Sequence, residues 1–138
     1  MRYVAFRAVN FRSLRKGKRE AVWEYNDSQE KCHEVNDLIA RFITDSFNIT
    51  DLNKDGTCEV WVMYKMSCRT DISPAKLKLV MHEGKKEFII SGHTKVGHTK
   101  DTYLGGDQTP DSNFQSGPKE FRDYGQKLFE RFINEDWK

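Results

Sequence analysis

Residues 59–65 decide how this chain folds, and they read Glu59-Val60-Trp61-Val62-Met63-Tyr64-Lys65. They contain the longest uninterrupted apolar run of the sequence, and its β-branched and aromatic residues favour an extended strand. Because the apolar character does not alternate, we expect a central strand that is covered on both faces. The run is far shorter than the ~20 apolar residues that cross a bilayer, so no membrane span is expected.

Two hairpins are predicted on either side of this strand. Residues 3–11 and 20–25 are rich in β-branched and aromatic side chains and are joined by a polar loop around Gly17, which indicates an antiparallel hairpin. Residues 77–91 alternate in the same way and are interrupted by a turn at residues 83–86, which indicates a second hairpin.

Three other segments are less regular. Residues 38–50 are predicted as a strand, although the short apolar run at residues 38–43 also fits a helix. Residues 26–34 are polar and are predicted as a loop. Residues 97–117 are dominated by Gly, Asp, Thr, Ser, Asn and Lys, and they predict a long exposed loop of a functional or mobile kind.

The C-terminal segment predicts a helix and completes the fold class. After Pro118, apolar side chains recur at steps of three and four, at Phe121, Tyr124, Leu128, Phe129, Phe132 and Ile133. An amphipathic helix and a sheet each need an apolar partner. We therefore predict a single α+β domain over residues 1–138, a mostly antiparallel β-sheet of about six or seven strands with the C-terminal amphipathic helix packed on it.

Charge is unevenly spread along the chain. The 138 residues carry 23 basic and 21 acidic side chains, but seven basic groups and only two acidic ones fall within residues 1–25. The basic cluster indicates either a surface that faces a polyanion or a solvated hairpin tip, and its position around a turn favours the tip. Nucleic acid is therefore not an expected partner.

One motif carries ion-binding chemistry, and it lies just before the central strand. Oxygen-bearing side chains fall at positions 1, 3, 5 and 9 of Asp51-Leu52-Asn53-Lys54-Asp55-Gly56-Thr57-Cys58-Glu59, and a glycine falls at position 6. Calcium needs six to eight converging oxygens. The predicted calcium ligands are Asp51, Asn53, Asp55, Glu59 and the main-chain carbonyl of Thr57, in a structural rather than a catalytic site.

Alternatives to calcium remain open. Asn, Asp and Gly also form turns that side-chain hydrogen bonds hold without a metal, and Lys54 could neutralise a carboxylate. Magnesium suits the motif less well because it keeps more water. The loop is not an EF-hand, since its position 12 is the apolar Val62. With its acid at position 9 and a strand following, it resembles the calcium loops of integrin-type β-propeller repeats.

The cysteines leave two arrangements open. Cys32, Cys58 and Cys68 form no CxxC pair, so a disulfide between Cys32 and Cys68 in an oxidising compartment and buried free thiols are both compatible with the sequence. There is no phosphate-binding glycine loop, no HExxH and no GxSxG. Catalysis is thus less expected than binding.

A family resemblance is carried by residues 49–56, 59–60 and 64–65, by Cys68, by residues 71–74 and by Leu77-Lys78-Leu79-Val80-Met81-His82-Glu83-Gly84-Lys85-Lys86. In these runs the chain resembles a bacterial family of small, usually exported proteins labelled surface polysaccharide biosynthesis proteins. The resemblance implies a β-rich fold with the acidic loop before a central strand, and no defined reaction. Because no export signal opens this chain, either a leader has been removed and the protein is periplasmic or cell-envelope associated, or it is cytoplasmic.

Together these features suggest three functions. The first is a non-catalytic, envelope-associated binding domain whose acidic loop is ordered by calcium. The second is a small inhibitor or immunity-type protein that blocks a toxin or enzyme, with the segment of residues 97–117 inserting into its partner. The third, an enzyme acting on glycans, would need a carboxylate pair that nothing beyond the acidic loop supplies. The expected partner is a protein or a surface glycan.

Overall fold

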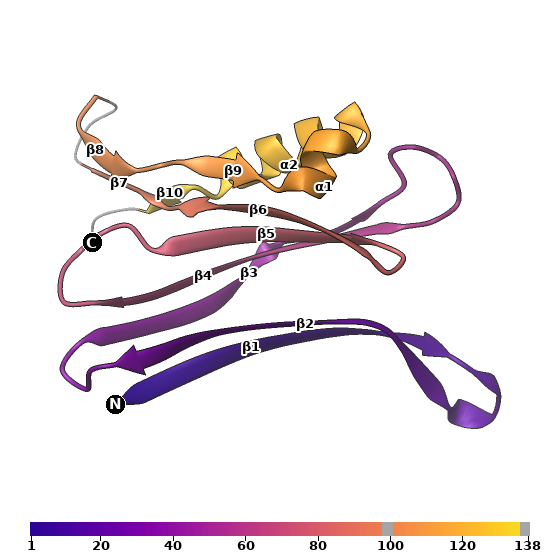
Figure 1. The fold of residues 1–138 in the computed structure, drawn as a ribbon, viewed down its shortest axis with the longest axis horizontal. Coiled ribbons are helices and arrows are strands. Elements are labelled where there is room, and N and C mark those ends of the chain that lie inside the picture. Colours follow the sequence, from indigo (N-terminus) through magenta and orange to yellow (C-terminus); the bar gives the residue numbers. More distant parts are fainter. Residues whose placement is uncertain (98–100, 136–138) are drawn as a thin grey trace.

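The computed structural model describes residues 1–97 and 101–135, with Glu30 described by its backbone only. The elements are β1 (Arg2–Ser13), the short 3-10 helix η1 (Arg15–Gly17), β2 (Arg19–Cys32), β3 (Asp37–Thr50), β4 (Glu59–Arg69), β5 (Lys76–Glu83), β6 (Lys86–His93), β7 (Lys95–Gly97), β8 (Tyr103–Gly105), β9 (Gln108–Pro110), α1 (Ser112–Ser116), α2 (Lys119–Arg131) and β10 (Asn134–Glu135). They form three layers, with the β1–β2 hairpin on one side of a central sheet and both helices on the other (Figure 1).

The central sheet has the strand order β3-β4-β5-β6-β9, and every neighbouring pair in it is antiparallel. A smaller sheet has the order β10-β7-β8, and its β10–β7 pair is parallel. The predicted α+β class, a mostly antiparallel β structure with a C-terminal helix packed on it, is confirmed. No helix within the described residues has the length and apolar character needed to cross a membrane.

Strand β4 is covered on both faces, as its unbroken apolar run predicts. Trp61 and Met63 are fully buried in the core on the helix side. Tyr64 and Met66, which point to the opposite face, belong to a second core beneath the hairpin. The apolar run therefore serves two layers at once.

The helix side is closed by α2, whose buried stripe includes Phe121, Leu128 and Phe129. Gly125 lets this helix approach the sheet, because a Cβ at that position would lie 3.1 Å from Ile90 Cδ1 and 3.2 Å from Trp61 Cζ3. Pro118 is the N-cap of α2, one residue before the first helical residue, Lys119.

The hairpin side combines apolar and polar contacts. Phe6 and Tyr25 of the hairpin are buried against the sheet. The ring of Trp23 stacks on that of His82, with centroids 3.8 Å apart and planes 5° from parallel. This layer is also attached covalently, because a disulfide joins Cys32 at the end of β2 to Cys68 near the end of β4, with a Cα–Cα distance of 5.6 Å.

The disulfide settles the open question about the thiols, and buried free thiols were the wrong alternative. Cys32 and Cys68 are bonded, and the remaining cysteine, Cys58, is exposed. Because β2 leads directly into the loop before β3, the bridge holds the hairpin against the sheet at the end where the chain passes between them.

Two predicted loops are corrected. Residues 26–34 were expected to be irregular, but β2 continues to Cys32 and pairs with the start of β1, where Ala5 lies opposite Ser28. Polar side chains are tolerated there because one face of this two-stranded ribbon is solvent-exposed. In the second case, the described part of residues 97–117 contains β8, β9 and α1 instead of a continuous loop, while residues 98–100 lie outside the described residues.

Candidate metal centre

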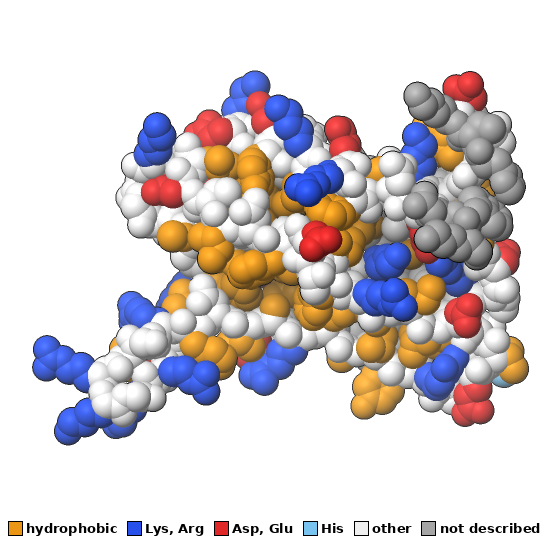
Figure 2. Space-filling view, turned by 180° about the vertical axis from the view of Figure 1, so that it is seen from behind, with side chains coloured by type: hydrophobic (Ala, Val, Ile, Leu, Met, Phe, Trp, Pro, Cys, Tyr) orange, Lys and Arg blue, Asp and Glu red, His pale blue; other side chains and the backbone are white. Residues whose placement is uncertain are grey.

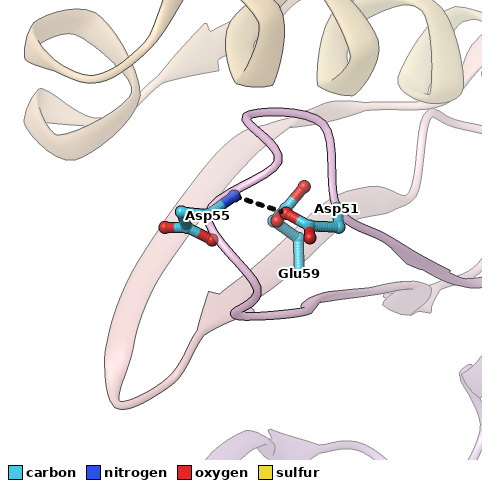
Figure 3. A group of neighbouring side chains, drawn as sticks. All are labelled: Asp51, Asp55 and Glu59. Carbon is cyan, nitrogen blue, oxygen red and sulfur yellow. Dashed lines mark hydrogen bonds between the residues drawn. The ribbon is translucent and has the colours of Figure 1, made fainter.

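The acidic loop connects β3 to β4, and its backbone is folded around one carboxylate. Asp51 Oδ1 accepts a hydrogen bond from the Asp55 N–H at 3.2 Å, and Asp51 Oδ2 accepts one from the Gly56 N–H at 3.1 Å (Figure 3). The reversal needs left-handed backbone at Lys54 (φ 56°) and Gly56 (φ 85°). Glycine adopts this conformation without steric cost, which explains the glycine at position 6.

Glu59 opens β4 and is buried beneath this loop with no exposed surface. Its Oε1 accepts hydrogen bonds from the Leu52 N–H at 2.6 Å and from the Thr50 hydroxyl at 3.0 Å. Its Oε2 is also buried, and it has no hydrogen-bond partner among the described residues. Leaving a buried acceptor unsatisfied costs about 1–3 kcal/mol, and more for a charged group.

The loop brings three of the predicted ligands together. One carboxylate oxygen each from Asp51, Asp55 and Glu59 lie within 4.8 Å of one another. Figure 3 shows the Glu59 carboxylate pointing toward that of Asp51, with Asp55 across the loop. No ion pair joins the Lys54 ammonium to a carboxylate in the described part of the chain. Among the described residues, the alternative in which Lys54 neutralises a carboxylate is therefore not observed, and the three charges repel one another.

The two other predicted ligands border this cluster. Asn53 Nδ2 donates a hydrogen bond to Asp55 Oδ2 at 3.1 Å, while its Oδ1 is buried without a hydrogen-bond partner among the described residues. The N–H of Thr57 donates to Asp55 Oδ1 at 2.8 Å. The role of the Thr57 carbonyl as a ligand stays a prediction.

A fourth carboxylate, which the sequence pattern missed, belongs to Glu83 at the end of β5. Its Oε2 accepts a second hydrogen bond from Asn53 Nδ2, at 3.0 Å. Burial raises the pKa of Glu83 above its usual value, and the charges of Asp55 and Glu59 contribute to the same shift. Glu83 could be found from sequence only through the strand register, because β4 and β5 pair Glu59 with Glu83.

A second polar cluster lies between the hairpin and the sheet. The Tyr64 hydroxyl donates a hydrogen bond to Asp27 and is also hydrogen-bonded to Tyr25, and Lys78 Nζ lies 3.2 Å from Asp27 Oδ2. Burial opposes ionisation of Asp27, but the hydrogen bonds from Tyr64 and Lys78 outweigh it and lower the pKa of Asp27. None of its side chains is among the described residues with a buried polar atom that lacks a hydrogen-bond partner, so this cluster serves to join the two layers.

The two clusters thus differ in one respect that bears on function. The cluster around Asp27 contains a cation for its carboxylate. The β3–β4 loop instead gathers three carboxylates, with a fourth beside it, and two of its buried oxygens have no hydrogen-bond partner among the described residues.

No known protein family, no curated protein and no solved structure matches this chain.

Proposed function

We propose that the chain is a non-catalytic binding domain whose β3–β4 loop holds a structural calcium ion. The observation that carries the proposal is the buried Oε2 of Glu59, which has no hydrogen-bond partner within the described part of the chain and lies beside the carboxylates of Asp51 and Asp55. A divalent cation would satisfy that oxygen and remove the repulsion among the three charges in one step.

The donor set favours calcium over magnesium. Asp51, Asn53, Asp55 and Glu59 supply oxygens from a single loop, and the main chain at Thr57 and the Glu83 carboxylate stand beside them. Calcium accepts six to eight such oxygens in irregular geometry, whereas magnesium demands a near-octahedral shell and keeps several waters.

A structural role is supported by what the carboxylates already do. Asp51 and Glu59 hold backbone N–H groups of the loop itself, so their positions determine its shape. An ion bound among them would fix the connection between two strands of the central sheet. The role is thus to order a surface loop, with binding as the activity of the domain.

The proposed setting is an oxidising compartment, such as the periplasm or the cell envelope. The disulfide between Cys32 and Cys68 supports it, because such bonds persist mainly outside the reducing cytoplasm. The resemblance to exported bacterial proteins agrees with it. The inhibitor or immunity-type function stays an alternative, with weaker support now that the described part of residues 97–117 is largely folded.

The proposal is tested by calcium titration calorimetry and by thermal melts in calcium and in chelator. If free calcium exceeds Kd about 100-fold, it should stabilise the protein by about 2.7 kcal/mol. Asp55→Asn keeps the acceptor for the Thr57 N–H but removes a charge, so binding should weaken at least tenfold. Asp45→Asn, the same change at an exposed site on β3, is the matched control. Identical melts in calcium and chelator, with no heat of binding, would refute the proposal.

A further inference from the structure

The tip of the β1–β2 hairpin extends beyond the sheet that supports the rest of the hairpin. Trp23 stacks on His82, which is the next-to-last residue of β5, and Asn10 pairs with Trp23 across the hairpin. Every residue between them along the chain from 11 to 21 is exposed. We call residues 11–21 the basic finger, and Figure 1 shows it projecting away from the other layers.

The finger concentrates positive charge that the protein does not neutralise. It carries five cations and one anion, at Arg12, Arg15, Lys16, Lys18, Arg19 and Glu20. Its single acidic residue is taken by Arg12, whose Nη2 lies 2.5 Å from Glu20 Oε2. Figure 2 shows the remaining basic side chains spreading from the end of the finger. Among the described residues, Arg15, Lys16 and Lys18 form no ion pair, so their charge is available to an external anion.

The shape of the finger selects the kind of anion. A convex tip cannot enclose a small ligand, so its partner must offer many anionic groups over an area. Two apolar side chains lie among the cations, Phe11 at 48% exposed and Leu14 at 45% exposed. Basic residues beside exposed apolar ones are typical of segments that bind the interface of an anionic bilayer.

Nucleic acid fits the finger less well. Proteins that bind single strands stack bases on free aromatic faces. The one aromatic ring of the finger, Phe11, is covered by the guanidinium of Arg19, whose Cζ lies 4.8 Å from the ring centroid. We infer that the basic finger docks the domain on an anionic lipid surface, with Lys and Arg contacting headgroups and Leu14 entering the interface.

Vesicle flotation tests this inference, with the protein in chelator so that the calcium loop plays no part. Wild-type protein should float with phosphatidylglycerol–phosphatidylcholine vesicles and not with phosphatidylcholine alone, and 0.5 M salt should weaken binding strongly. A juxtamembrane Lys or Arg contributes about fivefold in affinity, so Lys16→Gln/Lys18→Gln should reduce binding at least tenfold. Leu14→Ser should lower the binding that persists at high salt.

The matched control is Lys76→Gln/Lys127→Gln, which removes the same charge at two exposed sites outside the finger that form no ion pair among the described residues, and it should leave flotation unchanged. Far-ultraviolet circular dichroism checks that the finger variants fold, as expected for exposed residues. No flotation with anionic vesicles, or equal loss in the control, would overturn the inference. So would retention on single-stranded DNA without vesicle binding, which would make nucleic acid the partner.

Discussion

Glu59 and Glu83 lie directly opposite each other in the β4–β5 ladder, so two carboxylates share one face of neighbouring strands. Like charges in this arrangement destabilise a sheet. Asn53, in the β3–β4 loop, donates a hydrogen bond to Glu83 at the end of β5. The Oε2 of Glu59 accepts no hydrogen bond from the described residues. The repulsion between these two carboxylates therefore lowers the free energy of unfolding of the metal-free protein.

Replacing Glu83 should stabilise the metal-free protein and reduce the stabilisation that calcium gives. In chelator at pH 7, Glu83→Gln should raise the free energy of unfolding because it removes a charge held beside Asp55 and Glu59. Saturating calcium should raise the free energy of unfolding of this variant by less than it raises that of the wild type. Urea denaturation in both conditions measures this, and a variant that behaves alike in both would exclude Glu83 from the site.

The pH dependence of the same residue has a defined sign. Because the folded-state pKa of Glu83 is raised, the folded state takes up its proton first, and the stability cost of the ionised form disappears as pH falls through that pKa. In chelator, the stability advantage of Glu83→Gln over wild type should therefore shrink as pH is lowered from 7 toward 4. An advantage that stays constant over this range would contradict the assignment.

His82 should make the protein sensitive to acid. Burial lowers the pKa of His82 from 6.5 to about 4. Between these pH values His82 is therefore protonated in the unfolded chain but not in the folded protein. The contribution of neutral His82 to the free energy of unfolding should be fully present above pH 6.5, and the free energy should fall by about 1–3 kcal/mol as pH drops toward 4. His82→Phe, which retains a ring beneath Trp23, should remove this part of the loss, whereas His33→Gln at an exposed position should retain it.

Loss of the disulfide should weaken the attachment of the hairpin. The bridge spans 36 residues of sequence, and bonds that close loops of this length contribute about 2–4 kcal/mol. Cys32→Ser/Cys68→Ser should lower the free energy of unfolding by this amount in denaturant titrations. Cys58→Ser, at the exposed thiol, should change it by less than about 0.5 kcal/mol. Equal stability of all three proteins would argue against a bonded pair.

Removing only the hydroxyl of Tyr64, while keeping its ring, should lower the free energy of unfolding. Tyr64→Phe removes a hydrogen bond to Asp27 and another to Tyr25, so the expected loss is about 1–3 kcal/mol. Tyr3→Phe is the control because Tyr3 is largely exposed. A loss no larger than that of the control would show that the cluster does not hold the two layers together.

Local patterns were enough to predict the elements that meet a core. Trp61 and Met63 had to find apolar partners on one face, and Tyr64 and Met66 on the other, so a strand covered on both sides followed from the sequence. The stripe of Phe121, Leu128 and Phe129 fixed the helix in the same way. Residues 26–32 were missed because a ribbon with one exposed face can be polar along its length.

The candidate site was predictable only where its residues are neighbours in sequence. Asp51, Asp55 and Glu59 lie on one loop, so their spacing alone indicated that they converge. Glu83 joins them from another hairpin through strand register, which no local pattern encodes. The contact between Asp27 and Tyr64 likewise joins residues 37 positions apart and depends on how two layers stack.

The bridge between Cys32 and Cys68 also determines how the molecule would carry tension. A pull between the two ends of the chain passes along residues 1–32, crosses the sulfur–sulfur bond and continues from residue 68. Residues 33–67 then form a side loop outside this covalent path. That loop contains Asp51, Asp55 and Glu59, so among the carboxylates of the candidate ion site only Glu83 lies on the path that carries the tension.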